Sequence, residues 1–169
     1  MPKTYYWFAK AGGKLGYGDG RTPRVGRTHR VDVTPVLCVA GLHASPTPLA
    51  ALEFAGSSIL YGVHLSGEIV HGDDKSTATE RTYIWRMDAT HILRAFARRC
   101  ALDVIHLWDA PEVTVRYLRT GDQSLRAAAL AAARAAAWDA ALFAAWAAAW
   151  DAARARQSRR LLAMIRKAR

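Results

Sequence analysis

The chain has 169 residues, and its 24 lysines and arginines outnumber its 14 aspartates and glutamates, giving a net charge of +10. This length suits one domain with an appendage, and an apolar share of 51% is enough for a buried core. The positive charge favours a polyanionic partner such as nucleic acid, an acidic protein or an anionic nucleotide, although a role in solubility explains it equally well.

Membrane and secreted classes are not expected. The first five residues, MPKTY, lack the charged start and apolar core of a signal peptide. The most apolar stretch, residues 125–150, is mostly alanine and carries three charges, so it does not predict a membrane span. Cys38 and Cys100 have no paired-motif spacing, which is typical of reduced thiols in a cytoplasmic protein.

The first half of the chain predicts strands and one helix. Residues 5–10 are aromatic and β-prone, and candidate strands at 25–33 and 36–39 follow a glycine-rich segment. A helix is expected over 46–55, with Ser45 as its N-cap and Gly56 after its end. Strands at 59–65 and 79–85 follow, with a polar loop between them at 71–76.

From residue 88 the apolar period becomes helical. Ile92, Phe96 and Cys100 share one face, and a second helix begins near Pro111 and ends at Gly121. Strands followed by helices predict an α+β class, with a small, mainly antiparallel sheet and two or three helices. We expect this head domain to span residues 1–120.

Residues 121–169 predict one long alanine-rich helix in which large or charged side chains recur every four positions. Because four exceeds 3.6, Trp138, Leu142, Trp146 and Trp150 spread over about 120° of the helix surface. Such a face is too apolar to remain in water, so we expect it to form a homo-oligomer interface, with packing onto its own head as the alternative. The residues expected there are Trp138, Asp139, Leu142, Phe143, Trp146 and Trp150.

Two groups of basic residues are candidate binding sites. The arginines near the C-terminus include Arg156, Arg159 and Arg160; they either contact nucleic acid or complement the helix dipole. The glycine-rich segment and the strand after it offer Arg21, Arg24, Arg27 and Arg30. These side chains either hold phosphates or are solvated.

Several motifs carry a family resemblance. They are YWF at 6–8, LGYGDGR at 15–21, GLHAS at 41–45, GEIVHGDDK at 67–75 and ALDVIHLWDAP at 101–111. With them the sequence resembles a family of uncharacterised phage and prophage proteins that have variable alanine-rich C-terminal helices. The resemblance implies a viral origin and brings no activity with it.

Residues 41–80 also resemble the core of ADP-ribosyltransferase-like domains, with Gly-x-x-x-Ser, a helix, a strand and a later strand glutamate. That resemblance implies that His29 or Arg27 anchors a nicotinamide nucleotide (NAD) and that Ser45 supports the pocket. It also implies that Glu80 holds the ribose hydroxyl and stabilises the developing positive charge, with His43 as a further catalytic candidate. Only one acid stands where toxin-type members have two.

Other constellations are not supported. His64, His71, Asp73 and Asp74 lack the fixed spacing of metal ligands, so no metal is expected. The phage resemblance and the positive charge together favour a non-catalytic cytoplasmic phage protein, which we expect to bind a host protein, nucleic acid or nucleotide and to counter host defence. The alternatives are an NAD-using transferase and a nucleic-acid-binding protein, and no cofactor is expected outside the transferase reading.

Overall fold

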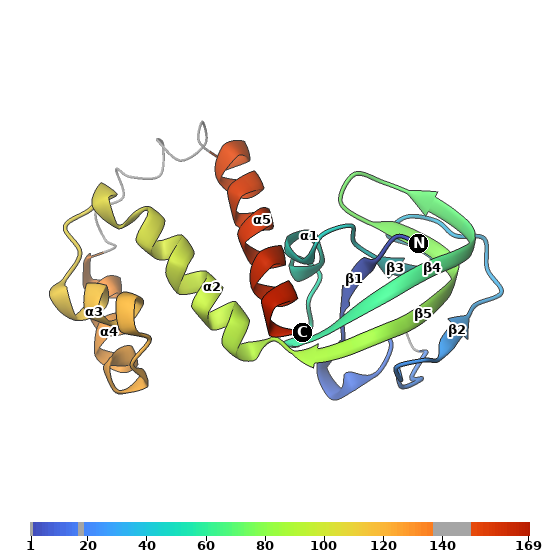
Figure 1. Cartoon of the computed structure of the whole chain (residues 1–169), viewed down its shortest axis with the longest axis horizontal. Coiled ribbons are helices and arrows are strands. Elements are labelled where there is room, and N and C mark those ends of the chain that lie inside the picture. The colour runs from blue at the N-terminus through green and yellow to red at the C-terminus, as the bar shows by residue number, and fades with distance from the viewer. Residues whose placement is uncertain (1, 17–18, 137–149) are drawn as a thin grey trace. The chain divides into compact units, whose positions relative to one another are not determined.

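The computed structural model describes residues 2–16, 19–136 and 150–169. It divides into two compact units (Figure 1). Unit 1 comprises Met1–Thr90 with Leu161–Arg169, and unit 2 comprises His91–Arg160. The expected boundary at residue 120 falls inside unit 2, because helices on either side of it pack together.

Unit 1 is a five-stranded antiparallel sheet, which confirms the expected α+β class. Its central strands, β4 and β5, form a long hairpin, β1 pairs with the outer edge of β4, and both β2 and β3 pair with the outer edge of β5. The strands are β1 (Tyr5–Phe8), β2 (Thr28–Arg30), β3 (Leu42–Ala44), β4 (Ile59–His71) and β5 (Ser76–Asp88).

The sheet curls until its two edges meet. Directly after β3, Ser45 exchanges two backbone hydrogen bonds with Tyr6 of β1, at 2.8 and 2.9 Å. Strand bulges bend β4 and β5 where their register shifts, one of them between Ser66 and Ile69 of β4. The concave face therefore encloses a core of Tyr5, Leu42, Ala44, Tyr61, Val63 and Tyr83, with Trp7 packed against it.

The predicted helix is shorter than expected and begins later. Helix α1 (Pro48–Leu52) is capped by Thr47, whose hydroxyl accepts a hydrogen bond from the Ala50 N–H at 3.2 Å. Ser45 was wrongly predicted as the cap, because its backbone is committed to the bridge with β1. The expected strand at 36–39 is also wrong: Val36 and Ala40 form only an isolated bridge, and the strand lies at β3.

Unit 2 is helical. The predicted helices appear as α2 (Thr90–Asp103), the first residue of which lies in unit 1, and α3 (Glu112–Thr120). Gly121 ends α3 in the left-handed conformation (φ 72°), as expected for a C-terminal glycine. Helix α4 (Arg126–Ala136) packs on α3, where the Thr114 hydroxyl donates to the Ala129 carbonyl at 3.3 Å.

The last helix, α5 (Trp150–Ala168), contributes to both units. Leu161 and Ile165 are buried, and the Arg169 guanidinium lies 4.5 Å from the Trp85 ring centroid within unit 1. This end of α5 therefore packs within unit 1. Of the expected interface, residues 138, 139, 142, 143 and 146 lie outside the described residues, and Trp150 is the first residue of α5.

Among the described helices, none is long and apolar enough to cross a membrane. The middle of the expected long helix, residues 137–149, lies outside the described residues. The prediction of an oligomer interface therefore stays a prediction.

We expect Gly62→Ala to lower the free energy of unfolding by about 1–3 kcal/mol, the usual cost of overpacking. A Cβ at Gly62 would lie 2.1 Å from the Trp85 indole, which itself contacts Tyr6 (ring centroids 6.2 Å apart). Urea unfolding measures the change. Glu68→Ala, at an exposed position of the same strand, is the control and is expected to stay within about 0.5 kcal/mol; an equal effect of both would contradict this packing.

Candidate anion-binding site

The site is built around Arg81, in the middle of β5. Side chains alternate between the two faces of a strand, and Arg81 is in phase with Thr77 and Tyr83, both of which are fully buried. Arg81 therefore points into the concave side of the sheet, where it is only 3% exposed.

Three neutral groups hold the Arg81 guanidinium. Nη1 donates to the His43 carbonyl oxygen at 2.6 Å, while Nη2 and Nε donate to the Tyr83 hydroxyl at 2.9 and 3.3 Å. Its central carbon lies 4.2 Å from the Trp7 ring centroid, a cation–π contact. These contacts fix the position of the guanidinium and leave its charge uncompensated.

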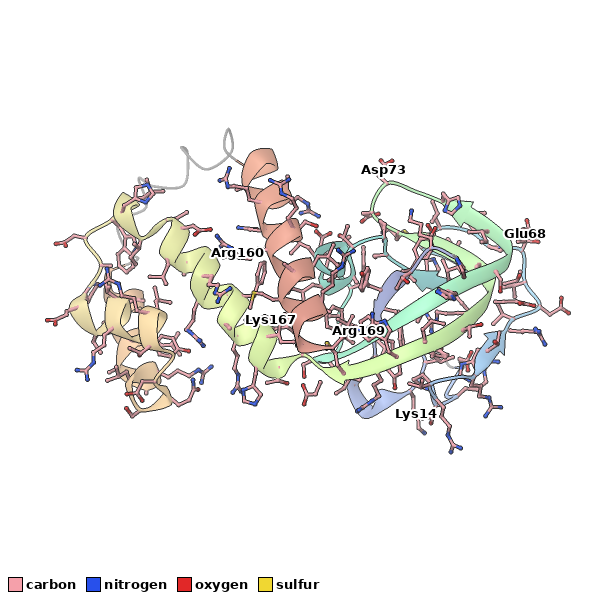
Figure 2. All side chains as sticks on the ribbon, viewed as in Figure 1. Lys14, Glu68, Asp73, Arg160, Lys167 and Arg169 are labelled. Carbon is pink, nitrogen blue, oxygen red and sulfur yellow. The ribbon has the colours of Figure 1, made fainter. Side chains whose placement is uncertain are left out.

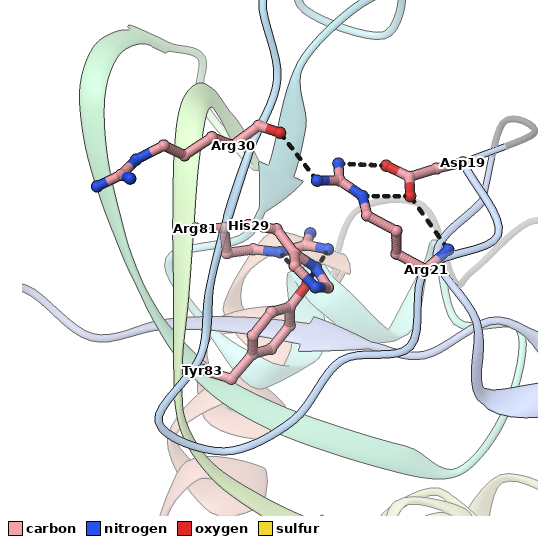
Figure 3. Close-up of polar contacts among 6 residues, drawn as sticks. All are labelled: Asp19, Arg21, His29, Arg30, Arg81 and Tyr83. Atoms are coloured by element: carbon pink, nitrogen blue, oxygen red, sulfur yellow. Dashed lines mark hydrogen bonds and ion pairs between the residues drawn. The ribbon is translucent and has the colours of Figure 1, made fainter.

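A buried charge is costly unless an opposite charge is paired with it. Among the described residues, no carboxylate forms an ion pair with Arg81. Burial lowers the pKa of Arg81, mainly through loss of solvation, but an arginine remains charged at neutral pH. The charge of Asp19 opposes the lowering of the Arg81 pKa, but Asp19 is itself bound by Arg21, whose Nε and Nη2 each donate to it at 2.6 Å (Figure 3).

His29 completes the polar network behind Arg81. Its Nδ1 lies 3.1 Å from the Tyr83 hydroxyl oxygen (Figure 3). Because arginine can only donate, the Tyr83 oxygen accepts from Arg81 and its own O–H is left to donate to Nδ1. That arrangement needs a neutral imidazole, and burial together with Arg21, Arg27 and Arg81 holds the pKa of His29 below its usual value.

Arg81 lines a cavity of about 300 Å³, which we call the arginine cavity. This volume is at the lower end of the range of about 300–1,000 Å³ that is typical of small-molecule sites. Apolar side chains form much of its wall, with Lys10 and Asp19 as its other charged residues. The wall includes Trp7, Leu15, Val31, Val33, Leu42 and His43.

A second cavity of about 150 Å³, the apolar cavity, shares Trp7, Lys10 and His43 with the first. Its wall is largely aromatic or aliphatic, with Lys75 as a further cation. It includes Tyr6, Phe8, Ala44, Ala51 and Phe54. The Lys75 ammonium lies 4.1 Å from the Phe54 ring centroid, and Lys10 Nζ donates to the Phe54 carbonyl at 3.4 Å.

The residues predicted for catalysis do not converge. His43 and Ser45 both line the apolar cavity, and His43 also lines the arginine cavity. Glu80 is one residue away from Arg81 on β5, so its side chain is on the opposite face of the strand. There it accepts from Arg30 Nε at 2.8 Å and from the Ser66 hydroxyl at 2.9 Å. Figure 3 shows Arg30 pointing away from the Arg81 network.

The arginines predicted to bind a ligand do not lie together at one site either. Arg21 fixes Asp19 and donates through Nη1 to the Arg30 carbonyl at 2.9 Å, which ties the glycine-rich segment to β2. Arg24 and Arg27 are exposed on a turn. Only Arg21 and His29 therefore belong to the surroundings of Arg81.

Near the C-terminus, Arg160 is engaged within unit 2. Its Nη1 and Nη2 donate to the Asp103 carboxylate at 2.6 and 3.2 Å. Arg156 and Arg159 are exposed.

Among the described residues, no group of three or more His, Cys, Asp or Glu side chains is placed to hold a metal ion. Asp73, one of the residues considered as a metal ligand, points outward from the β4–β5 loop (Figure 2).

Arg81 was not among the predicted site residues, although the strand pattern contains the signal for it. In TATERTYIW (77–85) the arginine is in phase with Thr77 and Tyr83, on the side of the strand that becomes the core. A charged residue in a buried phase is a reason to expect a partner or a ligand for it. Lys10 and Trp7 had no comparable signal, because cavity walls are assembled from distant segments.

Comparisons of the chain with protein-family models, with curated proteins and with solved structures found no match. The resemblances to phage proteins and to ADP-ribosyltransferase-like domains therefore stay predictions.

We expect the free energy of unfolding to fall as the pH drops from 7.5 to 5. Burial holds the pKa of both His29 and His43 below the value of about 6.5 for a free histidine. Below that pH the unfolded chain takes up protons that the folded chain refuses, so acid favours unfolding. Urea titrations at several pH values measure the slope.

His29→Asn is expected to reduce this pH dependence, because the amide offers the Tyr83 hydroxyl an acceptor and does not titrate. His91→Asn, at an exposed position on α2, is the control for the substitution. A wild-type stability that stays constant from pH 7.5 to 5 would contradict a neutral state of His29 and His43 in the folded protein.

Proposed function

We propose that this protein is a binding protein whose unit 1 holds an anionic ligand against Arg81. The observation that carries the proposal is a buried guanidinium that lines a cavity and forms no ion pair with any described carboxylate. A ligand anion would supply the missing charge, and an arginine fork is well suited to phosphate or carboxylate oxygens. Lys10, on the wall of both cavities, adds a second positive charge.

The proposal agrees with the expectation of a non-catalytic binding protein. On the sequence resemblance alone, we propose further that the ligand comes from an infected host cell and that its capture counters host defence. The transferase alternative is not favoured, because Glu80 is on the opposite face of β5 from Arg81 and is held by Arg30 and Ser66.

We expect inorganic pyrophosphate to bind the protein and Arg81→Met to weaken that binding about ten- to a hundredfold. Hydrogen bonds between charged groups contribute about 1.5–3 kcal/mol. Isothermal titration calorimetry at physiological salt measures the affinity. The same substitution at Arg86, which is exposed on the same strand, is the matched control and should leave the affinity unchanged.

The stability of Arg81→Met separates ligand binding from a purely structural role. Arg81→Met removes an unpaired buried charge, and this gain offsets the loss of the hydrogen bonds to the His43 carbonyl and the Tyr83 hydroxyl. We therefore expect the unliganded variant to be as stable as the wild type or more stable. If wild-type protein binds no pyrophosphate, or if Arg86→Met weakens binding as much as Arg81→Met does, the proposal is wrong.

A further inference from the structure

We propose that the anionic ligand is a free mononucleotide, with its phosphates in the arginine cavity and its base in the apolar cavity. This inference rests on the proposed function and specifies the ligand class. It starts from the adjacency of the two cavities, which share Trp7, Lys10 and His43 as common walls. A single ligand that occupies both needs one strongly anionic end and one flat apolar end.

The anionic end is identified by the number and placement of the cations. Arg81 and Lys10 line the arginine cavity, and Lys10 and Lys75 line the apolar cavity. The carboxylate on the wall, Asp19, is neutralised by a bidentate pair with Arg21. Lys75 also pairs with Asp74 at 3.7 Å, so the uncompensated positive charge of the site comes from Arg81 and Lys10. Two such cations favour a ligand with more than one negative charge, so a phosphate or diphosphate fits better than a single carboxylate.

The apolar end is identified by Phe54. Its side chain is 44% exposed although it lines a cavity. Lys75 lies over its ring at 4.1 Å, and Lys10 binds its backbone carbonyl at 3.4 Å. An exposed aromatic ring that two lysines hold in place is suited to stack on a base. Tyr6 and Phe8 give the same cavity further aromatic surface.

Polar groups on the walls of the apolar cavity can meet a base edge. Ser45 and His43 both line it. His43 accepts a hydrogen bond at Nε2 from the Cys38 backbone N–H at 3.0 Å, which holds the ring in one orientation. A few fixed polar groups in an apolar wall are the usual arrangement of a specific small-molecule site.

Calorimetric titration with ADP, adenosine and inorganic pyrophosphate tests the inference. We expect ADP to bind at least about tenfold more tightly than pyrophosphate, since base stacking adds to the phosphate contacts. Phe54→Ala should bring the affinity for ADP close to that for pyrophosphate while leaving the affinity for pyrophosphate unchanged. Leu107→Ala, which shortens another exposed apolar side chain (43%), is the control and should affect neither. Titrations with GDP, CDP and UDP then identify the preferred base.

Cys38 provides an independent readout, because it is exposed and lines the apolar cavity. In a Cys100→Ser background, we expect ADP to slow alkylation of Cys38 by iodoacetamide and pyrophosphate to leave the rate unchanged. This assay reports occupancy of the apolar cavity itself.

The outcomes separate the two proposals. Equal affinities for ADP and pyrophosphate, with no effect of Phe54→Ala and no protection of Cys38, would overturn the mononucleotide and leave the anion site standing. Binding of neither compound would overturn both proposals. A 5′-phosphorylated tetranucleotide that binds more tightly than ADP would overturn the free nucleotide in favour of a strand end.

Discussion

The charge of Arg81 inside a small curled sheet is the constraint on which unit 1 depends. A guanidinium that is 3% exposed needs its hydrogen bonds satisfied before the sheet can close around it. Tyr83 and the His43 carbonyl satisfy part of that need, and the Trp7 ring covers one face. The strands that supply these groups, β1, β3 and β5, are the ones that the curl brings together.

Closure of the sheet and formation of the cavities have the same cause. The backbone bridge between Ser45 and Tyr6 brings the chain after β3 beside β1, so residues from both line the apolar cavity. The glycine-rich segment, tied down by the Asp19–Arg21 pair, supplies a wall of the arginine cavity. A flat sheet of the same strands would keep these segments apart and expose Arg81 to water.

The buried arginine also explains why neutral histidines surround it. A protonated His29 would bring a second positive charge to the Tyr83 hydroxyl, which already accepts from Arg81. Burial and the nearby arginines oppose that protonation. At neutral pH, the positive charge of the site therefore comes from Arg81 and the lysines, in a pattern that an anion complements.

The sequence by itself determined the class of the fold and most of its elements. Alternation predicted the hairpin strands, and Gly121 predicted the end of α3, because these signals act within a few residues. Only the tertiary structure decided that Thr47, not Ser45, caps α1. The backbone of Ser45 is hydrogen-bonded to Tyr6 of β1, which lies 39 residues earlier in the chain. It also decided that Leu161–Arg169 belongs with the sheet, and that Arg81 and Lys10 line one cavity while Glu80 faces away. Such placements depend on which segments, far apart in the sequence, pack against each other, and a pattern within a few residues does not determine that packing.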